Sequence, residues 1–119
     1  MYEIKVKSHF SAAHNLKNYR GKCEHLHVHN LIVEAVFSYD ILDKSGIAVD
    51  FRKAKKMLND SIGELDHSYL NDIKSLKKIN PTSENIARFI YERIKRRNKS
   101  LTSVIVWENE NSSALYRET

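Results

Sequence analysis

The sequence predicts an α+β domain, in which an antiparallel sheet carries two helices stacked on one of its faces. Apolar and polar residues alternate near both ends of the chain, and apolar residues recur at helical spacing in the middle. The 119 residues include only three glycines and one proline, which leaves little room for linkers. A chain of this length makes one domain with a modest core. We therefore expect a single domain over residues 1–119, with the element order ββααββ.

Two long strands are expected in the first forty residues. Residues 2–12, YEIKVKSHFSA, alternate as a half-buried strand does. After a loop through Asn18 and Gly21, residues 27–39, HVHNLIVEAVFSY, are rich in β-branched and aromatic residues, which is typical of a strand. The sequence DKSG at 43–46 predicts a turn between this pair of strands and the helices.

Two helices are expected in the middle of the chain. The first, near 51–64, begins after Asp50 as N-cap, and its apolar stripe consists of Phe51, Ala54, Leu58, Ile62 and Leu65. The second begins where Thr82 or Ser83 caps the helix and Glu84 favours the positive end of the helix dipole. The second helix is expected to end among basic residues near 97, and its buried stripe consists of Ile86, Phe89, Ile90 and Ile94.

A closing hairpin is expected at the end of the chain, formed by 101–109 and 114–118 across a turn at 110–112. This arrangement leaves two sheet edges exposed. A small domain must either protect such edges or pair them with another copy of itself. We expect pairing, and therefore a homo-oligomer.

Composition and charge exclude several classes of protein. The chain is 41% hydrophobic and 29% charged, which is ordinary for a globular cytosolic protein, and we expect a cytoplasmic location. It has no apolar run of membrane-spanning length, and the opening MYEIKVKSHF does not resemble a signal peptide. The net charge is +5, and the basic residues cluster on the expected helices. We interpret them as solvated outer faces, with a phosphate- or nucleic-acid-binding surface as the alternative.

Histidine occurs at every second position of CEHLHVHN (23–30), at His25, His27 and His29. Residues two apart share one face of a strand, about 7 Å apart, so their imidazoles can converge on one ion. His14 in the neighbouring strand can supply a third nitrogen, and three imidazoles with an open fourth position are typical of catalytic zinc. The alternative is a set of hydrogen-bonded, metal-free polar residues. Five of the six histidines lie within residues 9–29, which favours metal, although spacing alone fits His25–His27 as well as His27–His29.

Three further positions can carry chemistry. Adjacent Asp66 and His67 can form an acid–base pair, although such pairs are also common in loops. Glu108 interrupts an apolar strand directly after Trp107, so it lies either at the solvated end of the strand or at the floor of a pocket that binds donor-rich ligand edges. Cys23, the only cysteine, is either buried packing, a metal ligand or a reactive thiol.

Six segments, taken together, resemble the 6-pyruvoyltetrahydropterin synthase and 6-carboxytetrahydropterin synthase family. They occur in the family's order and span nearly the whole chain: FSAAHNL (10–16), CEHLHVH (23–29), VDFRKAK (49–55), LDHSYLN (65–71), PTSEN (81–85) and VIVWEN (104–109). The resemblance implies the tunnelling fold, or T-fold, which has the same ββααββ order. It also implies trimeric barrels, commonly stacked as hexamers, with active sites between subunits.

The resemblance also implies roles for single residues. The zinc ligands that it implies are His14, His27 and His29, and His25 then has no role in binding the metal. It assigns Cys23 as the base that removes a proton, and Asp66 and His67 as the proton relay. The remaining positions bind substrate: Glu108 anchors the amino-pyrimidine edge of a pterin, and Glu84 with the Thr82–Ser83 backbone assists.

The implied substrate is 7,8-dihydroneopterin triphosphate. The carboxy branch of the family forms 6-carboxytetrahydropterin on the route to queuosine, with release of triphosphate and acetaldehyde, whereas the pyruvoyl branch keeps the side chain. Three residues separate Cys23 from His27, as in the carboxy branch, which is our leading interpretation. Val28 departs from the family's usual glycine, and Glu24 is similar to the glutamate of members that cleave dihydroneopterin side chains in folate synthesis.

The alternative from another class is a basic oligomeric module that binds nucleic acid or metal without turnover. Such a module has no use for Cys23, the Asp66–His67 pair and Glu108 together. We therefore expect a zinc lyase that acts on a small pterin, with no nucleic-acid partner and no membrane partner.

Overall fold

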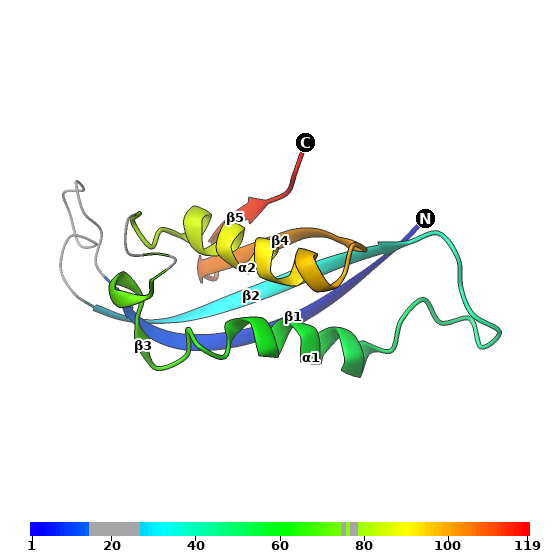
Figure 1. Ribbon diagram of the computed structural model, residues 1–119, viewed down its shortest axis with the longest axis horizontal. Coiled ribbons are helices and arrows are strands. Elements are labelled where there is room, and N and C mark those ends of the chain that lie inside the picture. Colours follow the sequence, from blue (N-terminus) through cyan, green and yellow to red (C-terminus); the bar gives the residue numbers. More distant parts are fainter. Residues whose placement is uncertain (15–26, 75, 77–78) are drawn as a thin grey trace.

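The computed structural model describes residues 1–14, 27–74, 76 and 79–119. Five strands form one sheet in the order β3-β1-β2-β4-β5, and both helices pack on one face of it (Figure 1). The predicted order ββααββ is thus confirmed, with one short additional strand, β3. The elements are β1 (Tyr2–His14), β2 (His27–Tyr39), α1 (Phe51–Ile62), β3 (Ser68–Tyr69), a 3₁₀ helix (Leu70–Asp72), α2 (Ser83–Arg97), β4 (Leu101–Asn109) and β5 (Ser112–Tyr116).

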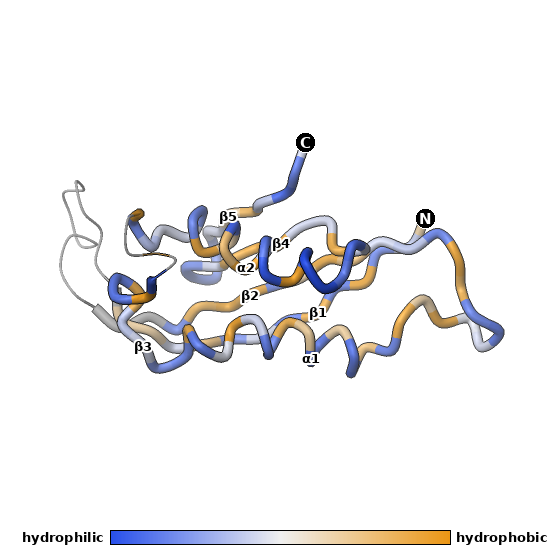
Figure 2. The backbone as a smooth tube through the Cα atoms, viewed as in Figure 1, coloured by the Kyte–Doolittle hydropathy of each residue, from blue (hydrophilic) through white to orange (hydrophobic). Residues whose placement is uncertain are grey.

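The sheet has one face that is buried under the helices and one that is not. In β1 the buried side chains include Val6 and Phe10, and Phe10 pairs with the fully buried Leu31 of β2. Hydrophobic and hydrophilic residues alternate along β1, whereas the middle of β2 is mainly hydrophobic (Figure 2). The helices cover the face that carries Phe10 and Leu31, and we call the opposite face the open face. Lys7, Glu34 and Trp107 belong to the open face, because each is one residue out of phase with the buried side chains.

Both helices begin at the N-caps that their sequences favour. The Asp50 carboxylate accepts a hydrogen bond from the Arg52 N–H at 2.8 Å, and the Thr82 hydroxyl accepts one from the Asn85 N–H at 3.1 Å. Thr82, not Ser83, therefore caps α2. Among the described residues, no helix has the length and apolar character needed to cross a membrane.

The buried stripes of the helices differ in part from the predicted ones. Phe51, the first residue of α1, is 64% exposed and so does not belong to the buried stripe. Phe89 of α2 is only partly buried, and two residues absent from the predicted stripe, Ala87 and Tyr91, are buried instead. The remaining predicted apolar positions of both helices are buried in the core.

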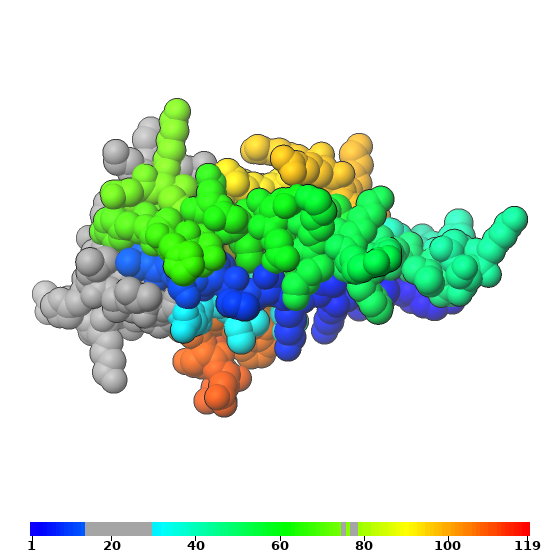
Figure 3. All heavy atoms as spheres, turned by 90° about the horizontal axis from the view of Figure 1, so that it is seen from below, coloured from blue at the N-terminus to red at the C-terminus, as the bar shows by residue number. Residues whose placement is uncertain are grey.

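The closing hairpin starts earlier than predicted. Asn109 pairs with Ser112, so β5 covers Ser112–Tyr116 and not residues 114–118. The reason is a tight turn, in which the Asn109 side chain accepts a hydrogen bond from the Asn111 N–H at 2.8 Å. Figure 3 shows the orange atoms around this turn standing out on the side opposite the helices.

Two sheet edges lack a strand neighbour among the described residues. β1 pairs with β3 only at Ala12 and Ala13, which leaves residues 2–11 as one edge, and β5 forms the other. Such edges present backbone donors and acceptors that can pair with another strand.

Candidate functional site

The three histidines predicted to bind metal occupy neighbouring positions at one end of the β1–β2 ladder. His14 pairs directly with His27, and His29 pairs with Ala12. Because paired residues and residues two apart share a sheet face, all three positions continue the face on which Ala12 and Phe10 are buried. His9 is out of phase with them and belongs to the open face.

This arrangement of backbone positions suits a zinc ion. Directly opposite residues of an antiparallel pair have Cβ atoms about 5 Å apart, and diagonal or alternate positions are about 7 Å apart. Three imidazoles at such spacings can reach one ion at Zn–N distances of about 2 Å and leave a fourth position open. Among the residues whose side chains the structure describes, no group of three or more His, Cys, Asp or Glu could hold a metal.

The predicted base, Cys23, lies outside the described residues, as do Glu24 and His25. They belong to the segment that joins β1 to β2 and precede His27 directly in the chain. Their roles therefore stay predictions.

The predicted relay pair is held against β1, close to where that strand ends. The Asp66 Oδ1 atom accepts a hydrogen bond from the Ser11 N–H at 2.9 Å, and the His67 N–H donates to the Ser11 carbonyl. The next two residues form β3, parallel to Ala12 and Ala13. The pair thus lies beside the strand that leads to His14. Asp66 and Ser11, which this contact brings together, are 55 residues apart in sequence.

His67 has an unusual backbone conformation. Its φ is 57°, in the left-handed region that few residues other than glycine adopt. Its Nε2 atom lies 3.6 Å from Asp66 Oδ2, and its side chain is 83% exposed. An exposed imidazole on a backbone in the left-handed region, with a carboxylate nearby, is an arrangement suited to proton transfer.

Glu108 lies near the end of β4. Its Oε2 atom accepts a hydrogen bond from the Ser83 hydroxyl at 3.0 Å, so the carboxylate is joined to the first residue of α2. Glu108 is half-buried, which differs from a freely solvated strand end. The remaining predicted substrate-binding residues lie in the same first turn: Thr82 is engaged as the N-cap, and Glu84 is exposed.

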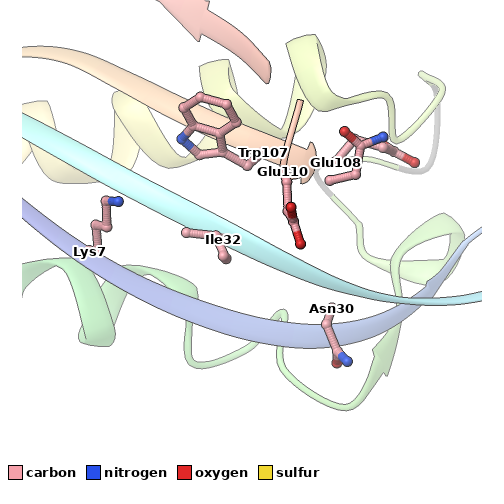
Figure 4. A pocket seen from close by; sticks show the side chains of 7 residues that line it. Lys7, Asn30, Ile32, Trp107, Glu108 and Glu110 are labelled. Atoms are coloured by element: carbon pink, nitrogen blue, oxygen red, sulfur yellow. The ribbon is translucent and has the colours of Figure 1, made fainter. Parts of the chain in front are cut away.

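A hollow of about 430 Å³ adjoins Glu108. Figure 4 shows Ile32 and Trp107 at its middle, with Lys7 at one end and Glu108 and Glu110 at the other. Its remaining lining residues are Asn30 and Asn109. Residue patterns predicted Glu108 but missed Lys7 and Trp107, because an alternating strand does not indicate which open-face residues meet across strands.

Similarity to known proteins extends over nearly the whole chain. A family model described as 6-pyruvoyl tetrahydropterin synthase matches residues 3–119. The chain is 35% identical over 122 residues to a 6-carboxy-5,6,7,8-tetrahydropterin synthase from Synechocystis sp., which covers 98% of this chain and 93% of the relative. It is 38% identical over 108 residues to a dihydroneopterin monophosphate aldolase from Pyrococcus furiosus, which covers 88% of each chain.

A solved structure has the same fold. The 6-pyruvoyl tetrahydropterin synthase of Caenorhabditis elegans superposes with a TM-score of 0.89 at 26% identity. The superposition covers 99% of this chain and 96% of that chain.

Proposed function

Because the chain belongs to the 6-pyruvoyl tetrahydropterin synthase family, we propose that it is a zinc-dependent 6-carboxy-5,6,7,8-tetrahydropterin synthase. Its substrates are 7,8-dihydroneopterin triphosphate and water, and its products are 6-carboxytetrahydropterin, acetaldehyde and triphosphate. Several relatives along the full chain carry this synthase name, including those from Synechocystis, Bacillus subtilis and Haemophilus influenzae. The proposed pathway is queuosine synthesis in the cytoplasm.

The observation that carries this proposal is the register of the β1–β2 ladder. His14 pairs with His27 and shares a sheet face with His29, which supports these three as the ligands of one zinc ion. When bound there, zinc supplies Lewis-acid polarisation of the substrate's side-chain hydroxyls. An ion held by three imidazoles would keep a fourth position for those hydroxyls.

The proton chemistry is proposed for Cys23 and for the Asp66–His67 pair. Cys23, as thiolate, removes a proton from the pterin side chain, and loss of the triphosphate group follows. His67, oriented by Asp66 at 3.6 Å, shuttles a proton at its exposed imidazole. The hydrogen bond from the Ser11 N–H holds the Asp66 carboxylate in place for this purpose.

Glu108 is proposed to bind the pterin ring. The amino-pyrimidine edge presents a pair of N–H donors, which one carboxylate can accept together. The Ser83 hydroxyl donates to Oε2 and so restricts the rotation of this carboxylate. Glu84 and the backbone at Thr82–Ser83 assist from the same helix start, and the net charge of +5 attracts the triphosphate.

The active unit is proposed to be a trimer or hexamer. The edge of β1 at residues 2–11 and the edge formed by β5 can pair between copies, which would bring sites together at subunit boundaries. Light scattering measures the oligomeric state, and an assay of the same sample measures its activity. A monomer with full activity would exclude this assembly.

A second candidate function is aldol cleavage of a dihydroneopterin side chain. Two observations favour it: Glu24 lies beside Cys23, and the relative from Pyrococcus furiosus is named as a dihydroneopterin monophosphate aldolase. A carboxylate can act as the base of such a cleavage.

Product identification tests the two candidates against each other. The protein is incubated with 7,8-dihydroneopterin triphosphate and, separately, with the monophosphate, and the products are identified by mass spectrometry. The carboxy function predicts 6-carboxytetrahydropterin and acetaldehyde from the triphosphate. A hydroxymethyl-dihydropterin and a two-carbon aldehyde from the monophosphate would support the aldolase instead.

A further inference from the structure

A hollow of about 250 Å³ lies between α1 and α2, which are neighbours in the helical layer (Figure 1). α1 contributes Asp60 and Ser61 to its lining, and α2 contributes Arg93, Arg96 and Arg97. Arg96 and Arg97 follow Arg93 by three and four residues, so the three arginines share one face of α2. The hollow is thus lined by charged and polar side chains from two elements.

Arg93 is held in place beside this hollow. Its guanidinium group forms an ion pair with Glu64, and its Cζ atom lies 4.7 Å from the centre of the Phe89 ring. These two contacts restrict the rotation of a long side chain. Less conformational entropy is therefore lost when the remaining N–H groups of Arg93 bind an anion.

Arg96 and Arg97 have no countercharge. Both are exposed, and in the part of the chain that the structure describes neither side chain forms an ion pair or a hydrogen bond. The acidic residue of the hollow, Asp60, is paired with Lys56, whose Nζ atom lies 2.8 Å from Oδ2. Like charges three and four residues apart destabilise a helix. Two positive charges of the hollow are thus unbalanced, and a bound anion would relieve their repulsion of Arg93.

The end of α2 is served by a different cation. The Lys95 ammonium group donates hydrogen bonds to the carbonyls of Lys99 and Leu101, at 2.9 and 2.8 Å. Lys95 therefore supplies the positive charge that the C-terminal end of a helix favours. Arg96 and Arg97 remain available to a ligand.

We propose that this hollow binds a phosphate group, with Arg93, Arg96 and Arg97 as its donors. A guanidinium group binds phosphate oxygens through paired N–H donors, and two unbalanced positive charges match a phosphate dianion. The ligand is inorganic phosphate or a small phosphate monoester. A nucleic acid would need a longer groove of cations with aromatic side chains on which its bases stack.

This site is separate from the proposed pterin site. Ser83, the hydrogen-bond partner of Glu108, is the first residue of α2, whereas Arg96 lies in its last turn. At 1.5 Å per residue the two positions are about 20 Å apart along the helix. The phosphate site therefore does not depend on the proposed function.

Two double variants separate the site from the net charge of the protein. Arg96→Gln/Arg97→Gln removes both unpaired guanidinium groups, and the exposure of both residues favours normal folding. Lys44→Gln/Arg117→Gln is the matched control, because it removes the same two charges from exposed positions outside the hollow. Circular dichroism checks that both variants fold. If the arginine double variant does not fold, Arg97→Gln alone replaces it.

Isothermal titration calorimetry of the assembled protein gives the Kd of inorganic phosphate and, separately, of glycerol 3-phosphate. Arg96→Gln/Arg97→Gln is expected to weaken binding about tenfold, as for the loss of two exposed ionic contacts, and Arg97→Gln alone about threefold. The control is expected to stay within about twofold of wild type. Tighter binding of glycerol 3-phosphate than of inorganic phosphate would identify the ligand as a monoester, and the reverse as the free anion.

Three results would overturn the proposal: no phosphate binding by wild type, an unaltered Kd in the folded arginine variant, or an equal loss in the control. A single-stranded RNA that binds more tightly than either phosphate through the same arginines would also overturn it, in favour of a nucleic-acid surface. The kcat and KM of the proposed synthase reaction are expected to be the same in the arginine variant and its control. A KM raised only in the arginine variant would place these arginines in the active site and contradict a separate site.

Discussion

Ser83 and Glu108 lie 25 residues apart in sequence and are joined by a hydrogen bond of 3.0 Å. The bond connects the first turn of α2 with the end of β4, so the buried core that positions α2 on the sheet also positions this carboxylate. Thr82, one residue earlier, caps the helix and fixes where Ser83 begins it. The helix start is therefore part of the candidate pterin site as well as of the fold.

Replacing Ser83 with alanine tests this link. Ser83→Ala removes the donor to Glu108, and we expect pterin affinity to fall roughly 3- to 10-fold, as for the loss of one hydrogen bond to a charged group. Ser83→Thr keeps a hydroxyl at the same position and should retain most of the affinity. Equal Kd values for neopterin in wild type and Ser83→Ala would show that Glu108 needs no such orientation.

The metal prediction is tested at single histidines. His27→Ala or His29→Ala should lose most of the bound zinc, because two imidazoles leave the ion under-coordinated. His9→Ala and His25→Ala are the controls: His9 belongs to the opposite sheet face, and His25 is the bystander of the predicted ligand set. Elemental analysis that found zinc lost from the His25 variant and retained in the His29 variant would overturn the assignment.

Cys23 and Glu24 distinguish the two candidate reactions. Cys23→Ala should keep zinc and the assembly while turnover falls by on the order of a hundredfold or more, as expected for loss of a positioned base. Glu24→Gln should change carboxy-branch turnover little. Zinc content and product formation are measured for both variants. Normal turnover in Cys23→Ala together with an inactive Glu24→Gln would make the carboxy-branch interpretation wrong.

The N-cap of α1 predicts a dependence of stability on pH. Hydrogen bonds from the Arg52 side chain and then from its backbone N–H hold the pKa of Asp50 below its usual value. A carboxylate with a lowered pKa stabilises the fold above its ordinary pKa of about 4 and loses that contribution as pH falls through the folded value. Asp50→Asn keeps a capping oxygen but not the charge, so its stability should fall less in acid. Urea unfolding between pH 6 and pH 3 measures this, with the exposed Asp40→Asn as control. An equally steep acid dependence in Asp50→Asn would contradict the prediction.

Patterns of neighbouring residues predicted most of the fold, because strands, helices and caps depend mainly on residues that are close in sequence. Strand alternation and helix caps located the main elements to within a few residues, and Asp50 was predicted as a cap on the same grounds. β3 was missed because two residues are too few to show any periodicity. Phe51 fits the apolar stripe of α1 but is 64% exposed, because helical spacing does not show which residues at the end of a stripe are covered.

The candidate site was harder to predict, because its contacts cross the whole chain. The Asp66–His67 pair was recognised as a dipeptide, but its attachment to Ser11 depends on a parallel strand pairing that no local pattern reports. Glu34 looks like an ordinary solvated residue of an alternating strand. It is buried, and its carboxylate accepts a hydrogen bond from the indole N–H of Trp107, which lies 73 residues away in sequence.

Zinc titration of metal-free protein tests the central claim most directly. Zinc is added stepwise to the assembled protein, and acetaldehyde release from 7,8-dihydroneopterin triphosphate is followed alongside the metal bound. The account predicts that the rate rises in proportion to bound zinc and reaches its maximum at about one ion per chain, as for a single catalytic site. Full activity in the metal-free protein, or no acetaldehyde from the zinc-saturated protein, would contradict it.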